Sequence, residues 1–277
     1  MDTVTRRKFL QLTAGAVAVG AAAPLLSVDE IAAAAINRPL AAGTPIVVMV
    51  TLYGGNDGLN TVIPFADPLY YSLRPEISYK AENMLPLDAE LALNPAMKGL
   101  KSLWDQKKVA IIRGVGYPNP DRSHFRATDI WHTGSDAKVV WDEGWAGRYL
   151  ATKYPGFPMK LPKDPMAIQL GSVESMLFQS DMGRFGTVFE DPNLFYQLVN
   201  GSTADSDAPP ATQAGEELGF LKQVAAASIQ YANVIQQSAT KGKNSTTYPT
   251  TGLGRQLGIV SKLISGGLTT PVYLVNI

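Results

Sequence analysis

Residues 44–53 read Thr-Pro-Ile-Val-Val-Met-Val-Thr-Leu-Tyr, and Gly54-Gly55 follow directly. This stretch is almost continuously apolar and rich in β-branched residues, without the regular polar alternation of a strand that faces water on one side. Such runs are typical of strands in parallel sheets, where helices cover both faces. The stretch therefore predicts a strand buried on both faces and an α/β fold with a mainly parallel sheet.

The segments downstream of this strand extend the α/β pattern. Residues 94–107 have apolar side chains at helical spacing, and residues 108–115 (Lys-Val-Ala-Ile-Ile-Arg-Gly-Val) predict a second buried strand. With residues 44–53 they predict a βαβ-type unit, although a long irregular segment precedes the helix. A weaker strand is expected at 166–170, and a β-branched one at 271–277. Further helices are expected at 123–133, 142–154, 216–237 and 253–264, and a surface loop at 201–211.

The composition restricts the possible classes of function. The 24 lysines and arginines balance the 24 aspartates and glutamates, so no net field attracts the chain to nucleic acid. The chain has no cysteine, which excludes disulfides, thiolate metal sites and cysteine nucleophiles. With only two histidines, His124 and His132, a three-histidine zinc site is excluded. The two lie roughly 80° apart around a helix, so we do not expect them to share one metal.

The N-terminus has the features of an export signal. Arg6 and Arg7 precede Phe9-Leu10, a weakly apolar stretch covers residues 12–26, and small residues follow it. This is the order of a twin-arginine signal. We therefore expect residues 1–42 to be a signal peptide and linker recognised by the twin-arginine translocase, and residues 43–277 to form one periplasmic or extracellular domain.

Two alternatives for the N-terminus stay open: a basic amphipathic segment of a cytoplasmic protein, and an uncleaved anchor. The apolar stretch is shorter and less hydrophobic than the roughly 20 strongly apolar residues of a membrane-spanning helix. We therefore expect no stable membrane span.

The loop after the first strand, residues 54–60 (Gly-Gly-Asn-Asp-Gly-Leu-Asn), is the first candidate site. Ligands of open α/β folds bind beyond the carboxyl ends of the strands, where the Asp57 carboxylate would be able to hold a cation. Alternatively, Asp57 and Asn60 only bond to their own backbone. The loop fits neither a phosphate-binding P-loop nor the dinucleotide glycine pattern.

The second candidate site begins a predicted helix at Asp121-Arg122-Ser123-His124-Phe125-Arg126. Ser123 would meet the free backbone N–H groups of the helix start, which favour a bound anion or a nucleophilic oxygen. Arg122 and Arg126 suit phosphate or sulfate oxygens, and His124 suits a metal or proton transfer. The alternative is that Asp121 or Ser123 simply caps the helix and the arginines are solvated.

The tryptophans near this helix also have two interpretations. Trp131, Trp141 and Trp145 are expected to pack in the core or at its rim, and the alternative is that they line a sugar-binding groove.

These motifs together resemble a known family. The twin-arginine signal, VVMVTLYGGNDGLNTVIP at 47–64, the segment 108–134 with its Arg-Ser-His-Phe, and GWAGRYL at 144–150 resemble the bacterial proteins called domain of unknown function 1501. The resemblance runs from the signal to the last residue. Those proteins are similar in architecture to the alkaline phosphatase and sulfatase superfamily, which implies a parallel sheet between helices with metals and nucleophile at the carboxyl ends of the strands.

Carried over by position, the resemblance implies that Asp57 is a metal-binding aspartate and, through a looser match, that Ser123 is the nucleophile. Family members continue past the strand at 271–277 into a Gly-Phe-Asp-Thr-His segment, and later supply a glutamate and an Asp-His pair. None of these is present here. The resemblance therefore implies an alkaline-phosphatase-like chain that is incomplete at its C-terminus.

We accordingly expect an exported relative of metal-dependent hydrolases of phosphate or sulfate esters. In the complete protein, Asp57 and His124 would bind a divalent metal (zinc, manganese or calcium), Ser123 would attack, and Arg122 or Arg126 would steady the anionic transition state. The present chain alone is expected to have little or no activity. The alternative is a non-enzymatic envelope or surface-assembly protein on the same scaffold.

Overall fold

The computed structural model describes residues 45–53, 55–200, 207 and 209–277. The predicted signal and linker at 1–42, with Arg6 and Arg7, lies outside these residues, as does most of the predicted loop at 201–211.

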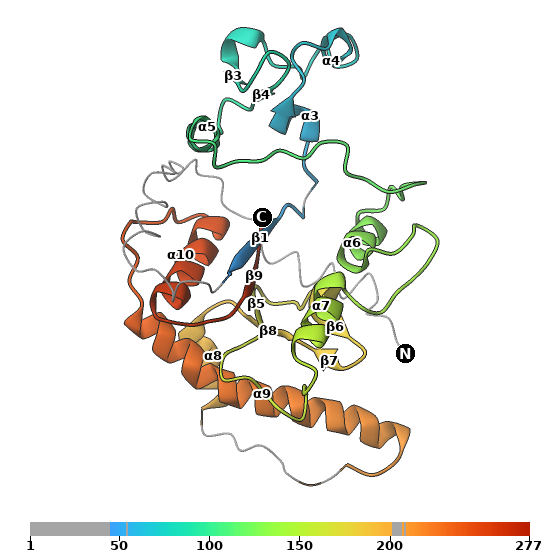
Figure 1. Ribbon diagram of the computed structural model, residues 1–277, viewed down its shortest axis with the longest axis vertical. Helices are drawn as coiled ribbons and strands as arrows, with labels where there is room; N and C mark the ends of the chain where they lie inside the picture. Colours follow the sequence, from blue (N-terminus) through green and yellow to red (C-terminus); the bar gives the residue numbers. More distant parts are fainter. Residues whose placement is uncertain (1–44, 54, 201–206, 208) are drawn as a thin grey trace.

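A four-stranded sheet forms the centre of the molecule (Figure 1). Its order is β1-β9-β5-β8, and every neighbouring pair is parallel. The strands are β1 (Val47–Thr51), β5 (Ala167–Leu170), β8 (Gly186–Phe189) and β9 (Val272–Asn276). The prediction of an α/β fold with a mainly parallel sheet is confirmed, together with the strands expected at 44–53, 166–170 and 271–277.

Helices flank this sheet, and four of them match predicted ones. The expected helices are α6 (His124–Thr133), α7 (Trp145–Lys153), α9 (Gln213–Lys241) and α10 (Gly252–Ser265). The unexpected α8 (Pro192–Val199) packs on α9. Helix α6 ends as expected at Gly134, whose φ of 72° is the left-handed conformation that glycine adopts at low cost.

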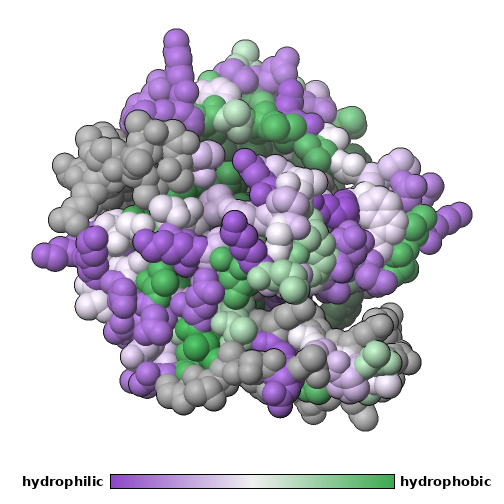
Figure 2. Space-filling model, turned by 60° about the horizontal axis from the view of Figure 1, so that its bottom comes forward, coloured by the Kyte–Doolittle hydropathy of each residue, from purple (hydrophilic) through white to green (hydrophobic). Residues whose placement is uncertain are grey.

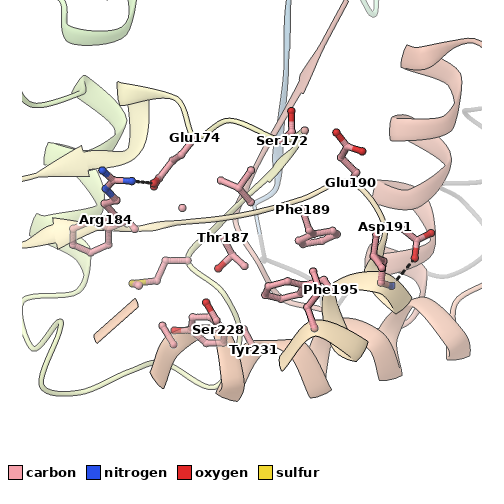
Figure 3. Close-up of a pocket in the computed structure, with 18 of the residues that line it drawn as sticks. Ser172, Glu174, Arg184, Thr187, Phe189, Glu190, Asp191, Phe195, Ser228 and Tyr231 are labelled. Atoms are coloured by element: carbon pink, nitrogen blue, oxygen red, sulfur yellow. Dashed lines mark hydrogen bonds and ion pairs between the residues drawn. The ribbon is translucent and has the colours of Figure 1, made fainter. Parts of the chain in front are cut away.

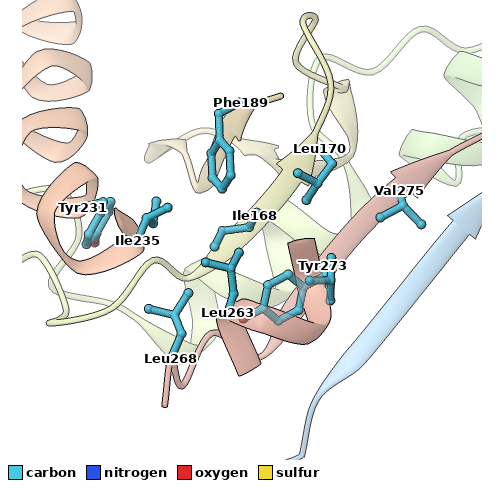
Figure 4. Close-up of a cluster of buried hydrophobic side chains, with 10 residues drawn as sticks. Ile168, Leu170, Phe189, Tyr231, Ile235, Leu263, Leu268, Tyr273 and Val275 are labelled. Atoms are coloured by element: carbon cyan, nitrogen blue, oxygen red, sulfur yellow. The ribbon is translucent and has the colours of Figure 1, made fainter. Parts of the chain in front are cut away.

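The two faces of the sheet bury separate apolar clusters. On one face, Ile168, Leu170, Tyr273 and Val275 pack against α9 and α10, through buried residues such as Leu263 (Figure 4). On the other face, Ala167 and Leu274 pack against α7 and the segment after β5. Successive residues of β5 and β9 thus point to opposite faces, and both faces are covered because both strands lie inside the sheet.

The segment after β5 packs on α7 at very short range. It contains the 3-10 turn η2 (Met176–Phe178) and a hairpin of β6 (Gln179–Ser180) and β7 (Gly183–Arg184). A Cβ atom added to Gly144 would lie 2.2 Å from the carbonyl oxygen of Leu177, and one added to Gly147 would lie 2.1 Å from that of Gln179. Only glycine allows this approach of the two backbones.

Between β1 and α6 the chain forms a small unit with its own core, in place of the predicted βαβ unit (Figure 1). Its three-stranded sheet has the order β2-β4-β3 and packs beside α4 around Ile63 and Tyr70. The elements are α3 (Gly58–Thr61), β2 (Val62–Ile63), α4 (Pro68–Ser72), η1 (Ala81–Asn83), β3 (Leu85–Pro86), β4 (Ala92–Leu93) and α5 (Lys98–Asp105).

Two predictions in this region are wrong. Residues 108–115 form no strand, and the side chain of Ile112 is 82% exposed. Strand β1 is not buried on both faces, since Val47 and Val50 are 53% and 46% exposed. Both errors have one cause: β1 is an edge strand that pairs with β9, and residues 108–115 do not join it.

Candidate functional site

The loop after β1 is held by backbone contacts, and it leaves the side chain of Asp57 outside them. The backbone of Tyr53 donates to the carbonyl of Ile277 at 3.2 Å, and the chain then turns into α3. The carbonyl of Asp57 accepts from Asn60 and Thr61. The Asp57 carboxylate makes no capping bond to α3, so it does not bond to its own backbone as the simpler alternative expects.

The carboxylate of Asp57 instead pairs with the guanidinium of Arg74. Arg74 comes from the small unit and is mostly buried, whereas the Asp57 side chain is 44% exposed. The amide of Asn60, also predicted to bond locally, donates to the carbonyl of Ile77 and accepts from the Tyr70 hydroxyl. The polar groups of this loop therefore connect β1 to the small unit.

The start of α6 lies against the same loop. A Cβ atom added to Gly55 would lie 3.3 Å from Cε1 of His124. The structure thus brings together residues 55–60 of the first candidate loop and the Arg122–His124 segment, which are more than sixty residues apart in the sequence. They meet beyond the carboxyl end of β1, where ligands of parallel sheets bind.

Ser123 is the N-cap residue of α6, but its hydroxyl does not cap the helix. Its backbone N–H donates to Oδ1 of Asp121 at 2.7 Å, and its carbonyl accepts from Ala127. Neither predicted capping residue, Asp121 or Ser123, therefore accepts a hydrogen bond from the second or third N–H of α6 through its side chain. The hydroxyl of Ser123 is thus not used in capping, and Arg122 beside it is exposed.

Arg126 has a structural contact that the sequence did not indicate. Its guanidinium donates to the carbonyls of Asp136, Ala137 and Val139, and so fixes the loop that follows α6. A role in steadying an anion stays a prediction for this residue, and it would have to compete with these bonds.

A buried polar cluster beside this site was not predicted. His132 lies with Nε2 3.3 Å from the Tyr53 hydroxyl and Nδ1 3.3 Å from the Ser175 hydroxyl. Burial lowers the pKa of His132 to about 4, so the ring is neutral at pH 7, and burial also raises the pKa of Tyr53. A tyrosine at the end of a predicted strand was the available signal, but nothing in the sequence linked Ser175 to it.

A hollow of about 390 Å³ lies next to this cluster, along β1 and α6. Trp131 and Trp145 line it, and they are 52% and 46% exposed. Trp141 lies elsewhere, under the guanidinium of Arg148 at 4.9 Å. The tryptophans therefore lie at the rim of the protein core, as expected, and two of them also border a cavity.

In the described part of the chain, no group of three His, Asp or Glu side chains is arranged to hold a metal ion. Asp57 and His124 are the predicted ligands, and the carboxylate of Asp57 is already paired with the guanidinium of Arg74. These residues alone do not fit a tightly bound metal, since stable sites in proteins use more ligands.

The fold and this site define the protein as an α/β protein whose candidate functional residues gather beyond the carboxyl end of an edge strand. The chain has no match among protein-family models, and no significant match among curated proteins or solved structures.

No described helix is long and apolar enough to cross a lipid bilayer. On the face shown in Figure 2, polar and apolar residues are interspersed.

Proposed function

We propose that the chain is an exported α/β protein related to metal-dependent hydrolases of phosphate or sulfate esters. The proximity of His124 to Gly55 carries this proposal. It brings the Arg-Ser-His-Phe segment to the Gly-Gly-Asn-Asp-Gly loop, as expected for a site assembled at the carboxyl end of a parallel strand. These are the two segments on which the resemblance to the domain of unknown function 1501 proteins depends most.

Each side chain has a role that its position supports. The N-terminus of α6 favours negative charge, so a phosphate or sulfate oxygen beside Ser123 would be stabilised by the helix start. The Ser123 hydroxyl would be the nucleophile, since it is not used in capping. The exposed Arg122 would pair with the ester oxygens. A divalent cation, when bound, would supply Lewis-acid chemistry.

The residues of this chain do not by themselves complete a metal centre. Asp57 and His124 supply two ligands, and Arg74 competes for the first. The apolar side chains of Val47 and Val50 on β1, and that of Leu52 just after it, are also exposed at this edge of the sheet. We therefore expect the 277-residue chain to be inactive by itself.

An activity assay tests whether the 277-residue chain is inactive by itself. The purified chain is supplied with zinc, manganese or calcium and assayed with p-nitrophenyl phosphate and p-nitrophenyl sulfate. We expect no more turnover than in the Asp57→Ala variant. Robust turnover that Asp57→Ala abolishes would show that the chain is complete enough to act.

Metal content of an extended protein tests the relation to hydrolases. The genomic sequence beyond codon 277 is read first, to learn whether it encodes a Phe-Asp-Thr-His segment. The extended protein should then bind a stoichiometric metal that Asp57→Asn removes. Asp105→Asn is the matched control, because Asp105 is also exposed and ion-paired, with Lys101. If the extended protein holds no metal, the non-enzymatic envelope or surface-assembly alternative is favoured.

Export is tested separately from chemistry. If the twin-arginine translocase carries the protein to the periplasm or beyond, Arg6→Lys together with Arg7→Lys should leave it in the cytoplasm. Fractionation of cells that express each form measures this. Equal export of both forms would remove the translocase from the proposal.

The hollow beside Trp131 and Trp145 favours a second candidate function, carbohydrate binding. Aromatic rings at an exposed rim suit the apolar faces of sugars. Binding to a glycan array that Trp131→Ala abolishes would support this function, and the absence of binding would exclude it.

A further inference from the structure

A second cavity lies at the other edge of the sheet, apart from the candidate site. It has a volume of about 420 Å³ and is bordered by β8, the turn after β5, α8 and α9 (Figure 3). Strands β9 and β5 separate β8 from β1. The cavity therefore shares no strand with the Asp57 loop, although its volume is within the range of small-molecule sites.

Aromatic rings form much of its wall. Phe189 and Phe195 stack with ring centres 5.4 Å apart, and Phe157 and Phe185 lie 4.4 Å apart. Tyr231 from α9 also lines the cavity. Aromatic surfaces bind apolar groups, and their faces attract cations.

The charged groups that border the cavity are mostly acidic. Three carboxylates, those of Glu174, Glu190 and Asp191, accompany one guanidinium, that of Arg184. Oδ1 of Asp191 caps α8 by accepting from the N–H groups of Asn193 and Leu194. The other two carboxylates lie on either side of Thr187 in Figure 3. The lining thus carries an excess of negative charge, which favours a cation.

Among the residues that the structure describes, two polar atoms at this cavity are buried without a hydrogen-bond partner. Glu174 pairs with Arg184 through Oε2, at 2.6 Å, and its Oε1 has no partner in the described part of the chain. The hydroxyl of Tyr231, whose side chain is almost fully buried, has none either. Buried polar atoms in proteins are nearly always bonded, so each of these indicates a missing partner. For a carboxylate oxygen, that partner must be a donor.

We propose that this cavity binds a small organic cation, in which an ammonium or guanidinium group is joined to an aromatic or branched apolar body. The cationic head donates to Oε1 of Glu174, and the negative lining offsets its charge. The body packs against the rings of Phe189 and Phe195. This inference does not depend on the hydrolase proposal, because none of these residues belongs to the candidate site at β1.

Binding of three matched probes to the 277-residue chain tests the inference. These are 2-phenylethylammonium, the neutral 2-phenylethanol and the anionic 3-phenylpropionate, measured by calorimetry or by NMR titration. We expect the ammonium probe to bind at least about tenfold more tightly than the alcohol, and the carboxylate to bind weakest. Equal affinity for the ammonium and the alcohol would overturn the proposal, as would no binding of the ammonium probe at millimolar concentration.

Variants locate the site. Glu174→Gln should lower the affinity for the ammonium probe about tenfold and leave the affinity for the alcohol unchanged, because it removes the charge and keeps the shape of the side chain. Glu82→Gln, an exposed carboxylate of the small unit, is the matched control and should change nothing. If Glu174→Gln does not fold, Glu190→Gln at the exposed rim should still lower the affinity for the ammonium probe severalfold. Unchanged binding in the variants that fold would overturn the assignment.

Discussion

Strands β1 and β5 belong to the same parallel sheet, yet their environments are opposite. All four residues of β5 are buried, whereas β1 exposes three of its five residues. The difference comes from their neighbours: β5 has β9 on one side and β8 on the other, while β1 pairs with β9 at the edge of the sheet. An apolar, β-branched run thus specifies a strand, but the segments that flank it decide how deeply it is buried.

The largest expected effect is the difference in stability lost when one apolar side chain is truncated in β5 and one in β1. Ile168→Ala in β5 should lower the free energy of unfolding by about 4 kcal/mol, because Ile168 is fully buried and the change leaves a cavity. Val50→Ala in β1 should cost under about 1 kcal/mol, since its side chain is already half in water. Urea unfolding of both variants measures the difference. Similar losses would mean that another part of the protein covers β1 in solution.

The next effect concerns His132, which connects the end of β1 to the segment after β5. Burial lowers its pKa to about 4 in the folded protein, against 6.5 when unfolded. Between these values the unfolded chain binds a proton that the folded chain does not, so stability falls as the pH falls. The loss should reach roughly 3 kcal/mol at pH 4 and be absent above pH 7.

Unfolding free energies of the wild type and of His132→Gln, measured from pH 7 to pH 4, isolate this contribution from that of the carboxylates. The difference between the two proteins should shrink or reverse as the pH falls. A constant difference would show that His132 is already solvated in the folded protein.

A smaller difference in stability is expected between losing the N-cap side chain of α8 and losing that of α6. Asp191 caps α8 through two N–H groups, whereas the Ser123 hydroxyl caps nothing at α6. Asp191→Ala should cost about 1 kcal/mol of stability and Ser123→Ala under about 0.5 kcal/mol. Thermal unfolding of the two variants measures both. A large loss in Ser123→Ala would show that its hydroxyl is needed for the fold and weaken its assignment as a nucleophile.

The smallest effect on stability is expected for Val50→Lys. The exposed position tolerates a charge at a cost of about 0.5 kcal/mol or less, and a lysine on an edge strand opposes pairing with another sheet. Light scattering at increasing concentration should therefore show less self-association than in the wild type. Strong destabilisation would contradict the edge position of β1.

The sequence predicted the local elements better than their arrangement. The strand at 166–170 has the weaker pattern, yet it is an interior strand, and the stronger run at 44–53 is at the edge. Residues 108–115 have the composition of a strand but no ladder partner, and a pattern cannot show whether a partner exists. The helix expected at 94–107 is present as α5, but the sheet of the small unit was missed because its strands have two residues each, too few to show a period.

For the candidate site, the sequence located the two segments but not the contacts of their side chains. The proximity of His124 to Gly55 agrees with the rule that ligand sites lie at carboxyl ends of strands. The pairing of Asp57 with Arg74 and the bonds of Arg126 to the 136–139 loop depend on the tertiary structure. The cluster of Tyr53, His132 and Ser175 joins three distant parts of the chain, and no local signal marks such a meeting.

Two glycines at the start of α7, its N-cap Gly144 and Gly147, also limit how this protein can move. Because Gly144 and Gly147 touch the carbonyls of Leu177 and Gln179, the helix has a single permitted register on that segment, and a slide by one residue would place a side chain where no space exists. Arg148 then ties α7 to the end of α6 through the carbonyl of Thr133. Helices α6 and α7 and the 177–179 segment should therefore shift as one body, and shear between them is blocked.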